Sequence, residues 1–490
     1  MGFQVALSPG NLVFCFVGVV IGTLVGVLPG LGPVAAISLL LPTTFHITPV
    51  SAVIMLAGIY YGAMYGGSTT SILVNIPGEA ASVVTCLDGY QMARQGRAGP
   101  ALGIAAFASF IAGSLAVVGL MLVAPPLAEM ALKFGPPEYF SLMIVGLTIL
   151  TFLASGPMWK ALLMACFGLF LGCMGMDSIM GTTRFTFSIV DLADGFGLVP
   201  VVMGLFGVSE VLLNVEQTLE RSIFETKIKN LLPTRKDWRD SIGAILRGSA
   251  IGFFLGILPG GGATISAFTA YAVEKKVSRH SEKFGSGVIA GVAAPESANN
   301  AATGGAFIPL LTLGIPTTAT MAILLGALVI YGTQPGPMLI QEHPDLFWGV
   351  VASMYVGNAL LLVLNLPLIG LWVKVLRVPY PILFPLILLF CLIGAYSLNN
   401  NIAQILFMII FGFLGYLFRK FRYEAAPLVL ALVLGPMLEK ALRRSLLHSG
   451  GDPTVFLTRP ISAVLLAIAF FLLIFPLIPK LGKKKPTFAE

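Results

Sequence analysis

The sequence predicts an all-α integral membrane protein with roughly ten to fourteen transmembrane or re-entrant helices, arranged as two inverted repeats that contain broken helices. Three observations predict this fold class: an apolar composition, apolar runs long enough to cross a membrane, and a glycine-rich motif present in each half of the chain. Of the 490 residues, 57% are hydrophobic and 10% are charged, whereas a soluble domain carries roughly 25% charged residues. Lipid must therefore cover much of the outside of the protein.

Apolar runs recur along the whole chain. A helix needs about 20 residues to cross the hydrocarbon core of a bilayer. Runs of about that length or longer lie at 11–28, 33–67, 100–124, 138–154, 158–176, 196–213, 243–273, 287–333, 346–373, 380–397, 401–418 and 461–479. Some of these runs are of double length or interrupted, so the expected number of crossings is a range.

The charges divide the chain into two halves. Lys and Arg give a net charge of +7, but they form short clusters between apolar runs, which is typical of cytoplasmic loops and argues against nucleic-acid binding. The longest polar stretch, 214–240, is expected to be a basic cytoplasmic linker. It separates an N-terminal repeat half, 1–213, from a C-terminal half, 241–490, that adds extra helices and a basic tail.

Two basic segments near the C-terminal end conflict in their expected topology. The tail at 483–485 and the segment 419–459 are both basic, yet one clear apolar run separates them. Both can lie on the cytoplasmic side only if residues 424–438 form a re-entrant or interfacial piece.

A twelve-residue motif occurs twice. Residues 21–32, Ile-Gly-Thr-Leu-Val-Gly-Val-Leu-Pro-Gly-Leu-Gly, match residues 251–262, Ile-Gly-Phe-Phe-Leu-Gly-Ile-Leu-Pro-Gly-Gly-Gly, at seven of the twelve positions. Polar, Gly-rich stretches follow each copy in the same order: Tyr65-Gly-Gly-Ser-Thr-Thr-Ser71 and Asn75-Ile-Pro-Gly78 in the first half, and Glu296-Ser-Ala-Asn-Asn300, Gly304-Gly305 and Gly314-Ile-Pro-Thr-Thr318 in the second. This order indicates a duplication.

The charge distribution predicts that the two copies are inverted. The first copy is preceded by no Lys or Arg and is followed by Arg94 and Arg97. The second copy is preceded by the basic linker. It is followed by the cluster Lys275, Lys276, Arg279 and Lys283, and then by no Lys or Arg until Lys374. If basic loops lie inside, the two halves enter the membrane from opposite faces.

The motifs predict a binding site at membrane depth. Pro removes a backbone donor and Gly permits positive φ, so a helix breaks at each Leu-Pro-Gly. Paired breaks in two halves mark the site of a transporter, although glycines that only allow close helix packing are the alternative. Broken helices expose N–H groups that bind carboxylates. We therefore expect the substrate to be held by Gly30, Gly32, Ser68, Thr69, Thr70, Asn75, Gly260, Gly261, Ser297, Asn299, Asn300, Thr317 and Thr318.

A coupling cation is expected at the same place. Carbonyls freed at helix breaks can coordinate Na⁺, and Glu296 is the one acid inside the repeat motifs. We expect Glu296 and Asn300 to couple a cation, with Glu296 ligating Na⁺ or carrying a proton; a helix-capping Glu at an interface is the alternative. Symport would offset the cost of moving an anion into a negative interior, about 2.3 kcal/mol per charge per 100 mV. Glu79 and Asp88 are expected in a solvated loop.

Other functional classes fit the sequence less well. The four histidines do not cluster, and no HExxH, GxSxG or P-loop motif occurs. The chain is therefore not expected to be an enzyme, and it needs no cofactor other than Na⁺ or H⁺ as a coupling ion. The alternatives are a polytopic membrane enzyme that acts on a lipid-linked substrate, which would need several converging acids or histidines, and a channel, which would need a continuous pore.

Over nearly its whole length, the chain resembles the large membrane subunit of the bacterial tripartite tricarboxylate transporters. The resemblance rests on Gly26-Val-Leu-Pro-Gly-Leu-Gly32, Tyr61-Gly-Ala-Met-Tyr-Gly-Gly-Ser-Thr-Thr-Ser71, Asn75-Ile-Pro-Gly78, the Asp88-Gly-Tyr…Gly96 loop and Pro295-Glu-Ser-Ala-Asn-Asn-Ala301. It implies a permease in the bacterial inner membrane that works with a small membrane subunit and a periplasmic solute-binding protein. It also implies import of carboxylates such as citrate, driven by a Na⁺ or H⁺ gradient, and an elevator-like movement by analogy with other inverted-repeat transporters.

Overall fold

The chain folds almost entirely as helix. A computed structural model describes residues 1–28, 32–154, 156–177, 179–216, 230–375, 378 and 380–474. The described residues are helices and their connections, apart from a small hairpin in which β1 (Gly175–Met176) pairs antiparallel with β2 (Thr183–Arg184). The predicted all-α class is confirmed.

The helices divide into two compact units. The first unit comprises Met1–Glu129 and Gly197–Phe418, and the second comprises Met130–Phe196 and Arg419–Glu490. The first contains α1 (Gly2–Ala6), α2 (Pro9–Val27), α3 (Pro33–Leu40), α4 (Pro49–Val74), α5 (Val83–Arg94), α6 (Ala98–Ala131), α9 (Leu198–Val202), α10 (Ser209–Glu216), α11 (Arg235–Ile257), α12 (Ala263–Val277), α13 (Ala290–Gly305), α14 (Phe307–Leu313), α15 (Ala319–Ile330), α16 (Leu339–Glu342), α17 (Pro344–Asn365), α18 (Ile369–Val375), α19 (Tyr380–Asn399) and α20 (Ile402–Lys420), of which α6 and α20 run slightly past its boundaries. The second contains α7 (Pro136–Leu153), α8 (Met158–Gly172), α21 (Ala426–His448), α22 (Val455–Thr458) and α23 (Pro460–Ile474). Short turns of tighter or wider helix are η1 (Leu41–His46), η2 (Ala80–Ser82), η3 (Val190–Leu192), η4 (Met203–Val208) and η5 (Ser281–Lys283).

The helices have the lengths that a membrane requires. Within the described residues, eight are long and apolar enough to cross a bilayer: Pro9–Val27, Pro49–Val74, Ala98–Ala131, Pro136–Leu153, Leu198–Glu216, Arg235–Ile257, Pro344–Asn365 and Ile402–Lys420. Shorter apolar helices occupy Pro33–His46, Met158–Gly172, Ala319–Ile330, Ile382–Leu398 and Pro460–Ile474. The long apolar runs of the sequence are divided, because 33–67 holds α3, η1 and most of α4, and 287–333 holds α13, α14 and α15.

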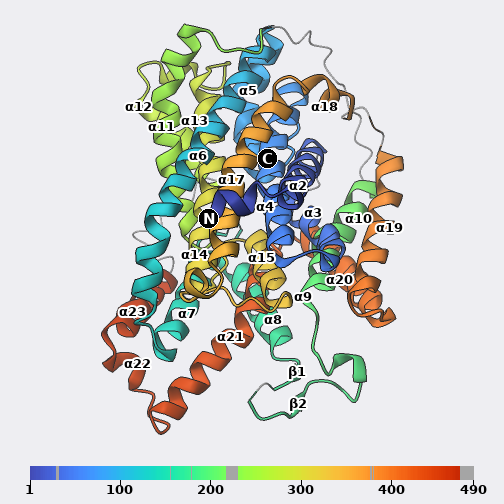
Figure 1. Cartoon of the computed structure of the whole chain (residues 1–490), viewed down its shortest axis with the longest axis vertical. Helices are drawn as coiled ribbons and strands as arrows, with labels where there is room; N and C mark the ends of the chain where they lie inside the picture. The colour runs from blue at the N-terminus through green and yellow to red at the C-terminus, as the bar shows by residue number, and fades with distance from the viewer. Residues whose placement is uncertain are drawn as a thin grey trace. The chain divides into compact units, whose positions relative to one another are not determined.

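Helices α2 and α4 pack closely because glycines of α2 face the backbone of α4 (Figure 1). Gly18, Gly22 and Gly26 recur every fourth residue, so they share one face of the helix. A Cβ atom added at these positions would lie 2.2, 2.5 and 2.2 Å from the carbonyl oxygens of Met55, Ile59 and Ala63, respectively. No side chain fits at that distance, so Gly is required along this whole contact.

Helices α11 and α13 repeat the same arrangement in the second half (Figure 1). An added Cβ at Gly248, Gly252 and Gly256 would lie 2.4, 2.2 and 2.3 Å from the carbonyl oxygens of Ala294, Ala298 and Ala302, respectively. Each of these glycines lies 230 residues after its counterpart in α2. The duplicated sequence motif therefore corresponds to a duplicated helix contact.

In both halves, a later helix ends in the same way. Helix α4 ends at Asn75, which is left-handed with φ of 58°, and Ile76-Pro77 follows. Helix α14 ends at Gly314, also left-handed with φ of 69°, and Ile315-Pro316 follows. A left-handed residue closes the helix end and the Pro two residues later prevents its continuation.

The prediction that Glu79 and Asp88 lie in a solvated loop is wrong. Glu79 is 8% exposed and Asp88, which lies within α5, is 0% exposed. The Asp88 carboxylate accepts hydrogen bonds from the backbone N–H groups of Gly287 and Val288, both at 2.8 Å, and from the Tyr271 hydroxyl at 2.8 Å. Asp88 is buried because it caps the chain that leads into α13, about 200 residues further on.

The polar stretch 214–240 is helical at both of its described ends. Helix α10 continues to Glu216, and α11 begins at Arg235 after a capping box between Thr234 and Asp237. The middle of the expected linker, 217–229, lies outside the described residues, as does the basic tail at 483–485. Most of the uncertain segment 424–438 belongs to α21.

In the second unit, the β1–β2 hairpin is anchored to α21 by two arginines. Arg443 Nη1 lies 2.6 Å from Asp177 Oδ2, and Arg184 Nη1 lies 2.8 Å from Glu439 Oε1. The backbone N–H of Ile179 and the Arg443 guanidinium lower the pKa of Asp177 to about 2. Asp177 is therefore fully ionised near neutral pH.

Candidate functional site

The candidate site lies in the first unit, where the broken segments of the two halves meet the polar face of α13. In the second half, the Leu-Pro-Gly loop turns through Gly260 and Gly262, whose φ angles are 75° and 35°. The Gly260 N–H donates to the carbonyl of Thr317 at 2.8 Å, which joins this loop to the second break. Thr318 then begins α15, because its hydroxyl accepts from the Met321 N–H at 3.2 Å.

The first half forms an equivalent junction. The Thr70 hydroxyl donates to the carbonyl of Val27 at 2.7 Å and so satisfies an acceptor at the end of α2. Gly78 lies against Gly26, and a Cβ added at Gly78 would lie 2.1 Å from the Gly26 carbonyl oxygen. Gly32 begins α3, and Asn75 is exposed at the end of α4. The predicted site residue Gly30 lies outside the described residues.

Glu296 is the centre of a buried polar cluster. Its side chain lies in the middle of α13 and is 1% exposed. Ser68 donates to Oε2 at 2.5 Å, Thr85 donates to Oε1, and Ser109 donates to Oε2 at 3.4 Å. These hydroxyls come from α4, α5 and α6, so one carboxylate of the second half is held by three helices of the first. We call Glu296, Ser68, Thr85, Ser109 and Asn300 the Glu296 cluster.

Asn300 completes this cluster one helical turn after Glu296. Its Nδ2 donates to Ser109 Oγ at 2.7 Å and to the backbone carbonyl of Glu296 at 3.1 Å. Ser297, in contrast, donates to the Ala293 carbonyl within its own helix at 2.7 Å. The structure thus brings together Glu296 and Asn300, the two residues expected to couple a cation, and Ser68, which was expected to hold the substrate.

The remaining predicted residues lie around the cluster in separate places. Thr69 lines a small cavity of about 10 Å³ beside Ser68, together with Tyr65 and Asn365. Gly261 is buried, and an added Cβ there would lie 2.1 Å from the Leu255 carbonyl oxygen, so it shapes the turn after α11. Thr317 is buried at the second break.

Sequence reasoning missed Thr85, Ser109 and the Glu79 carboxylate as members of the polar interior. Ser109 is a hydroxyl inside a long apolar run, which was the available signal for it. Thr85 gave no such signal, since it lies in the mixed segment after the first break. Glu79 directly follows the Ile-Pro-Gly break, and its Oε1 accepts from Asn299 Nδ2 at 3.3 Å.

The electrostatics of this interior are unusual. Among the described residues, neither Glu296 nor Glu79 forms an ion pair with Lys, Arg or His. An unpaired carboxylate is expensive to bury, so it must either take up a proton or bind a cation. Within the described residues, no group of three or more His, Cys, Asp or Glu could hold a metal ion.

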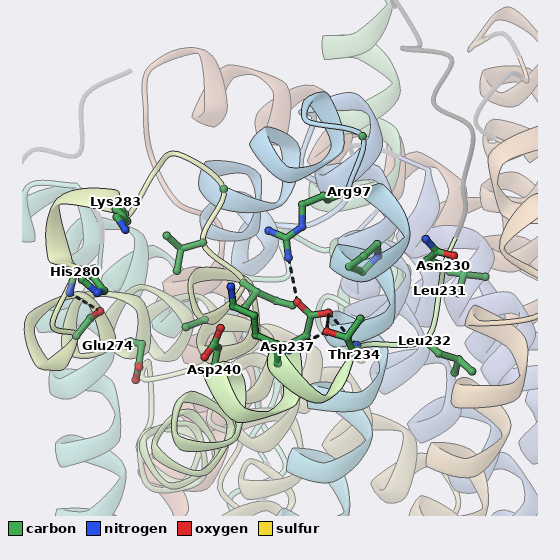
Figure 2. A pocket seen from close by; sticks show the side chains of 18 of the residues that line it. Arg97, Asn230, Leu231, Leu232, Thr234, Asp237, Asp240, Glu274, His280 and Lys283 are labelled. Atoms are coloured by element: carbon green, nitrogen blue, oxygen red, sulfur yellow. Dashed lines mark hydrogen bonds and ion pairs between the residues drawn. The ribbon is translucent and has the colours of Figure 1, made fainter.

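A large cavity of about 1510 Å³ lies elsewhere in the first unit (Figure 2). It opens beside the starts of α6 and α11, and its walls mix cations with acids. Arg97 Nη2 lies 3.0 Å from Asp237 Oδ1, and Asp237 Oδ2 accepts from the Thr234 N–H at 2.9 Å, as Figure 2 shows. None of the predicted site residues lines this cavity. Two of its acids are engaged in ion pairs, Asp237 with Arg97 and Glu274 with Arg247.

Comparison with known proteins gives an independent view of the chain. The profile of the Tripartite tricarboxylate transporter TctA family matches residues 12–430. This region includes the glycine-mediated helix contacts α2–α4 and α11–α13, the helix breaks of both halves and the Glu296 cluster. No solved structure matches the chain.

Two proteins from Agrobacterium vitis are similar in sequence. The "Uncharacterized 52.8 kDa protein in TAR-I ttuC' 3'region" is 51% identical over 485 residues, which cover 99% of this chain and 97% of that protein. The "Uncharacterized protein in TAR-II ttuC' 3'region" is 52% identical over 234 residues, which cover 48% of this chain and 97% of that protein.

Proposed function

Because the chain belongs to the tripartite tricarboxylate transporter TctA family, we propose that it imports a citrate-like tricarboxylate or related organic acid by cation symport. Membership of this family makes the chain a multi-pass protein of the bacterial inner membrane and a transporter subunit, not an enzyme. The proposal adds the substrate, the coupling ion and the residues that hold them. It also adds the partners: a small membrane subunit and a periplasmic solute-binding protein that delivers the substrate.

The Glu296 cluster is the observation that carries the proposal. A buried carboxylate surrounded by three hydroxyls and no basic side chain is costly in a protein with a purely structural role. It becomes useful if Glu296 alternately binds and releases a cation during transport. Because its hydroxyl partners come from α4, α5 and α6, occupancy of Glu296 changes how the two halves hold each other.

We propose that the substrate carboxylates bind at the helix breaks. The first turns of α3, α12 and α15 present N–H groups that favour anions. Gly32, Gly260, Gly261 and Thr317 lie at or beside these turns. A trianion that enters against a potential of 100 mV costs about 7 kcal/mol, and each coupled cation returns about 2.3 kcal/mol. Cation symport therefore offsets the electrical cost of accumulating the anion.

The two repeats are proposed to be inverted. The matching glycines of α2 and α11, separated by 230 residues, support a duplication. The distribution of basic residues supports opposite orientations of the two halves. Single cysteines at two exposed positions, Arg94→Cys and Gln334→Cys, provide the test. An impermeant thiol reagent should label them from opposite faces of the membrane in a background without other reactive cysteines. Labelling of both from one face would contradict the inversion.

The proposed function is tested by uptake into proteoliposomes that contain this chain and its small membrane subunit. Labelled citrate is offered with and without the binding protein, under an imposed Na⁺ or H⁺ gradient. Uptake that needs both the binding protein and one cation gradient is expected. A folded complex that takes up no member of a broad carboxylate panel, with its own binding protein present, would overturn the proposal. A channel would instead show uptake without any cation gradient.

A further inference from the structure

A second buried carboxylate, Glu79, lies beside the candidate site and has no role in the scheme above. It follows the break at Pro77-Gly78 and is 8% exposed. Its Oε2 accepts from the Ala81 N–H at 2.6 Å, so it caps the turn that leads into α5. Its Oε1 accepts from Asn299 Nδ2 at 3.3 Å. The Ser82 N–H also donates to this carboxylate, so three hydrogen bonds leave about one of its roughly four acceptor sites for a further ligand.

Two other buried oxygens near Glu79 lack a partner. Asn299 is 1% exposed and Thr317 is 0% exposed, and within the described residues neither Asn299 Oδ1 nor Thr317 Oγ1 has a hydrogen-bond partner. The amide that carries Asn299 Oδ1 is the one that contacts Glu79. Buried polar atoms are rarely left unpaired in folded proteins, so each of these two oxygens is a candidate ligand for a bound ion.

The surroundings connect Thr317 with the same region. The Tyr60 side chain lies near those of Thr303, Glu79 and Thr318, the neighbour of Thr317. Thr303 follows Asn299 by one turn of α13, and its hydroxyl donates to the Asn299 carbonyl at 3.0 Å. Glu79, Asn299 and the second break are therefore parts of one polar region, formed by α4, α13 and the start of α15.

We propose that Glu79 and Asn299 bind a Na⁺ ion at a site separate from the Glu296 cluster. The unpartnered atoms are acceptors, and a hard cation takes oxygen ligands without needing any donor. A single carboxylate matches the charge of a monovalent ion. Glu296 lies three residues before Asn299 on α13, so the two sites lie next to each other on one helix.

The inference deepens the proposed symport and rests on it for its biological meaning. If each site takes one cation, a trianion crosses with a net charge of about −1, and the opposing cost falls from about 7 to about 2.3 kcal/mol per 100 mV. The binding site itself, however, does not depend on the identity of the substrate or on the partner subunits.

The test is direct Na⁺ binding to the purified full-length chain in lipid nanodiscs, without substrate. Radioactive ²²Na⁺ binding is measured by scintillation proximity at constant ionic strength, with choline replacing Na⁺. Measured in a Glu296→Gln background, so that a cation at the Glu296 cluster does not contribute, Glu79→Gln should weaken Na⁺ binding by about tenfold or more, as loss of a metal-site residue usually does. Glu274→Gln is the matched control, since Glu274 is a buried acid of the same unit whose charge pairs with Arg247 at 2.8 Å; it should bind Na⁺ like the wild type.

Two further variants keep the inference falsifiable. Glu296→Gln should retain the Glu79-dependent binding, because it belongs to the other cluster. If Glu79→Gln does not fold, Asn299→Ala keeps the carboxylate and should still weaken Na⁺ binding. Unchanged ²²Na⁺ affinity in both Glu79→Gln and Asn299→Ala, compared in the Glu296→Gln background, or ²²Na⁺ binding to the wild type that unlabelled Na⁺ does not displace, would overturn the proposed site. Failure of citrate uptake in proteoliposomes would contradict the proposed substrate but not this Na⁺ site, because the Na⁺-binding assay contains no substrate.

Discussion

The packing of α11 against α13 sets how accurately the polar face of α13 is positioned, and Gly252→Ala tests this contact. The added Cβ would lie 2.2 Å from the Ala298 carbonyl oxygen, 2.6 Å from its Cα and 2.8 Å from its carbonyl carbon. All three neighbours are backbone atoms, so there is no flexible side chain that could move away. The two helices must separate, and overpacking of this kind costs about 1–3 kcal/mol.

The measurement is the apparent melting temperature of the detergent-solubilised protein, which is monitored by the reactivity of buried cysteines as they become exposed. Gly252→Ala should melt several degrees below the wild type. Gly10→Ala is the matched control, because Gly10 lies near the start of α2 and a Cβ there meets nothing within 4 Å. It should leave the melting temperature unchanged or raise it, since Ala favours a helix over Gly by about 1 kcal/mol. Equal melting of Gly252→Ala and the wild type would refute the proposed requirement for Gly at this contact.

Three further predictions follow from individual contacts. Ser109→Ala removes the acceptor of Asn300 Nδ2 and leaves a buried donor unpaired, so a stability loss of about 1–3 kcal/mol is expected in thermal melting. Asp177 has a depressed pKa, so its contribution to stability is present above its ordinary value of 3.8 and is lost only as the pH falls through about 2. Asp177→Asn should therefore leave the pH profile of uptake between about pH 5 and 8 unchanged. Trypsin should cleave the hairpin of this variant faster at Arg184. A shifted pH profile would contradict the purely structural role of Asp177. Arg97→Gln breaks an ion pair whose Arg side chain is 43% exposed, so its effect on the melting temperature should correspond to no more than about 1 kcal/mol.

Sequence patterns identified those features that depend on local chemistry. The breaks after Val74 and Leu313 were predictable because each is followed by an Ile-Pro pair, which stops a helix wherever the chain goes. Two interpretations of the glycines were possible, packing and helix breaking, and the structure assigns both. Gly22 and Gly252 serve helix packing, whereas Gly260 serves the turn.

Features that depend on distant parts of the chain could not be predicted in this way. Asp88 lies in a segment with nearby arginines and a polar composition, which suggests solvent, yet its partners are backbone groups near Val288. Thr85 is likewise defined by Glu296, 211 residues later. Local composition carries no information about such contacts, so the sequence identified Glu296 as a candidate but not most of the hydroxyls that hold it.

The most direct test of the central claim is a comparison of two transport modes in Glu296→Gln proteoliposomes, prepared with the small membrane subunit and the binding protein. Gln has the shape of the protonated Glu side chain but cannot release a proton or attract a cation. We predict that Glu296→Gln loses gradient-driven accumulation of labelled citrate but retains exchange of citrate across the membrane, while Glu274→Gln keeps both. Accumulation by Glu296→Gln at the wild-type level under the same cation gradient would contradict it.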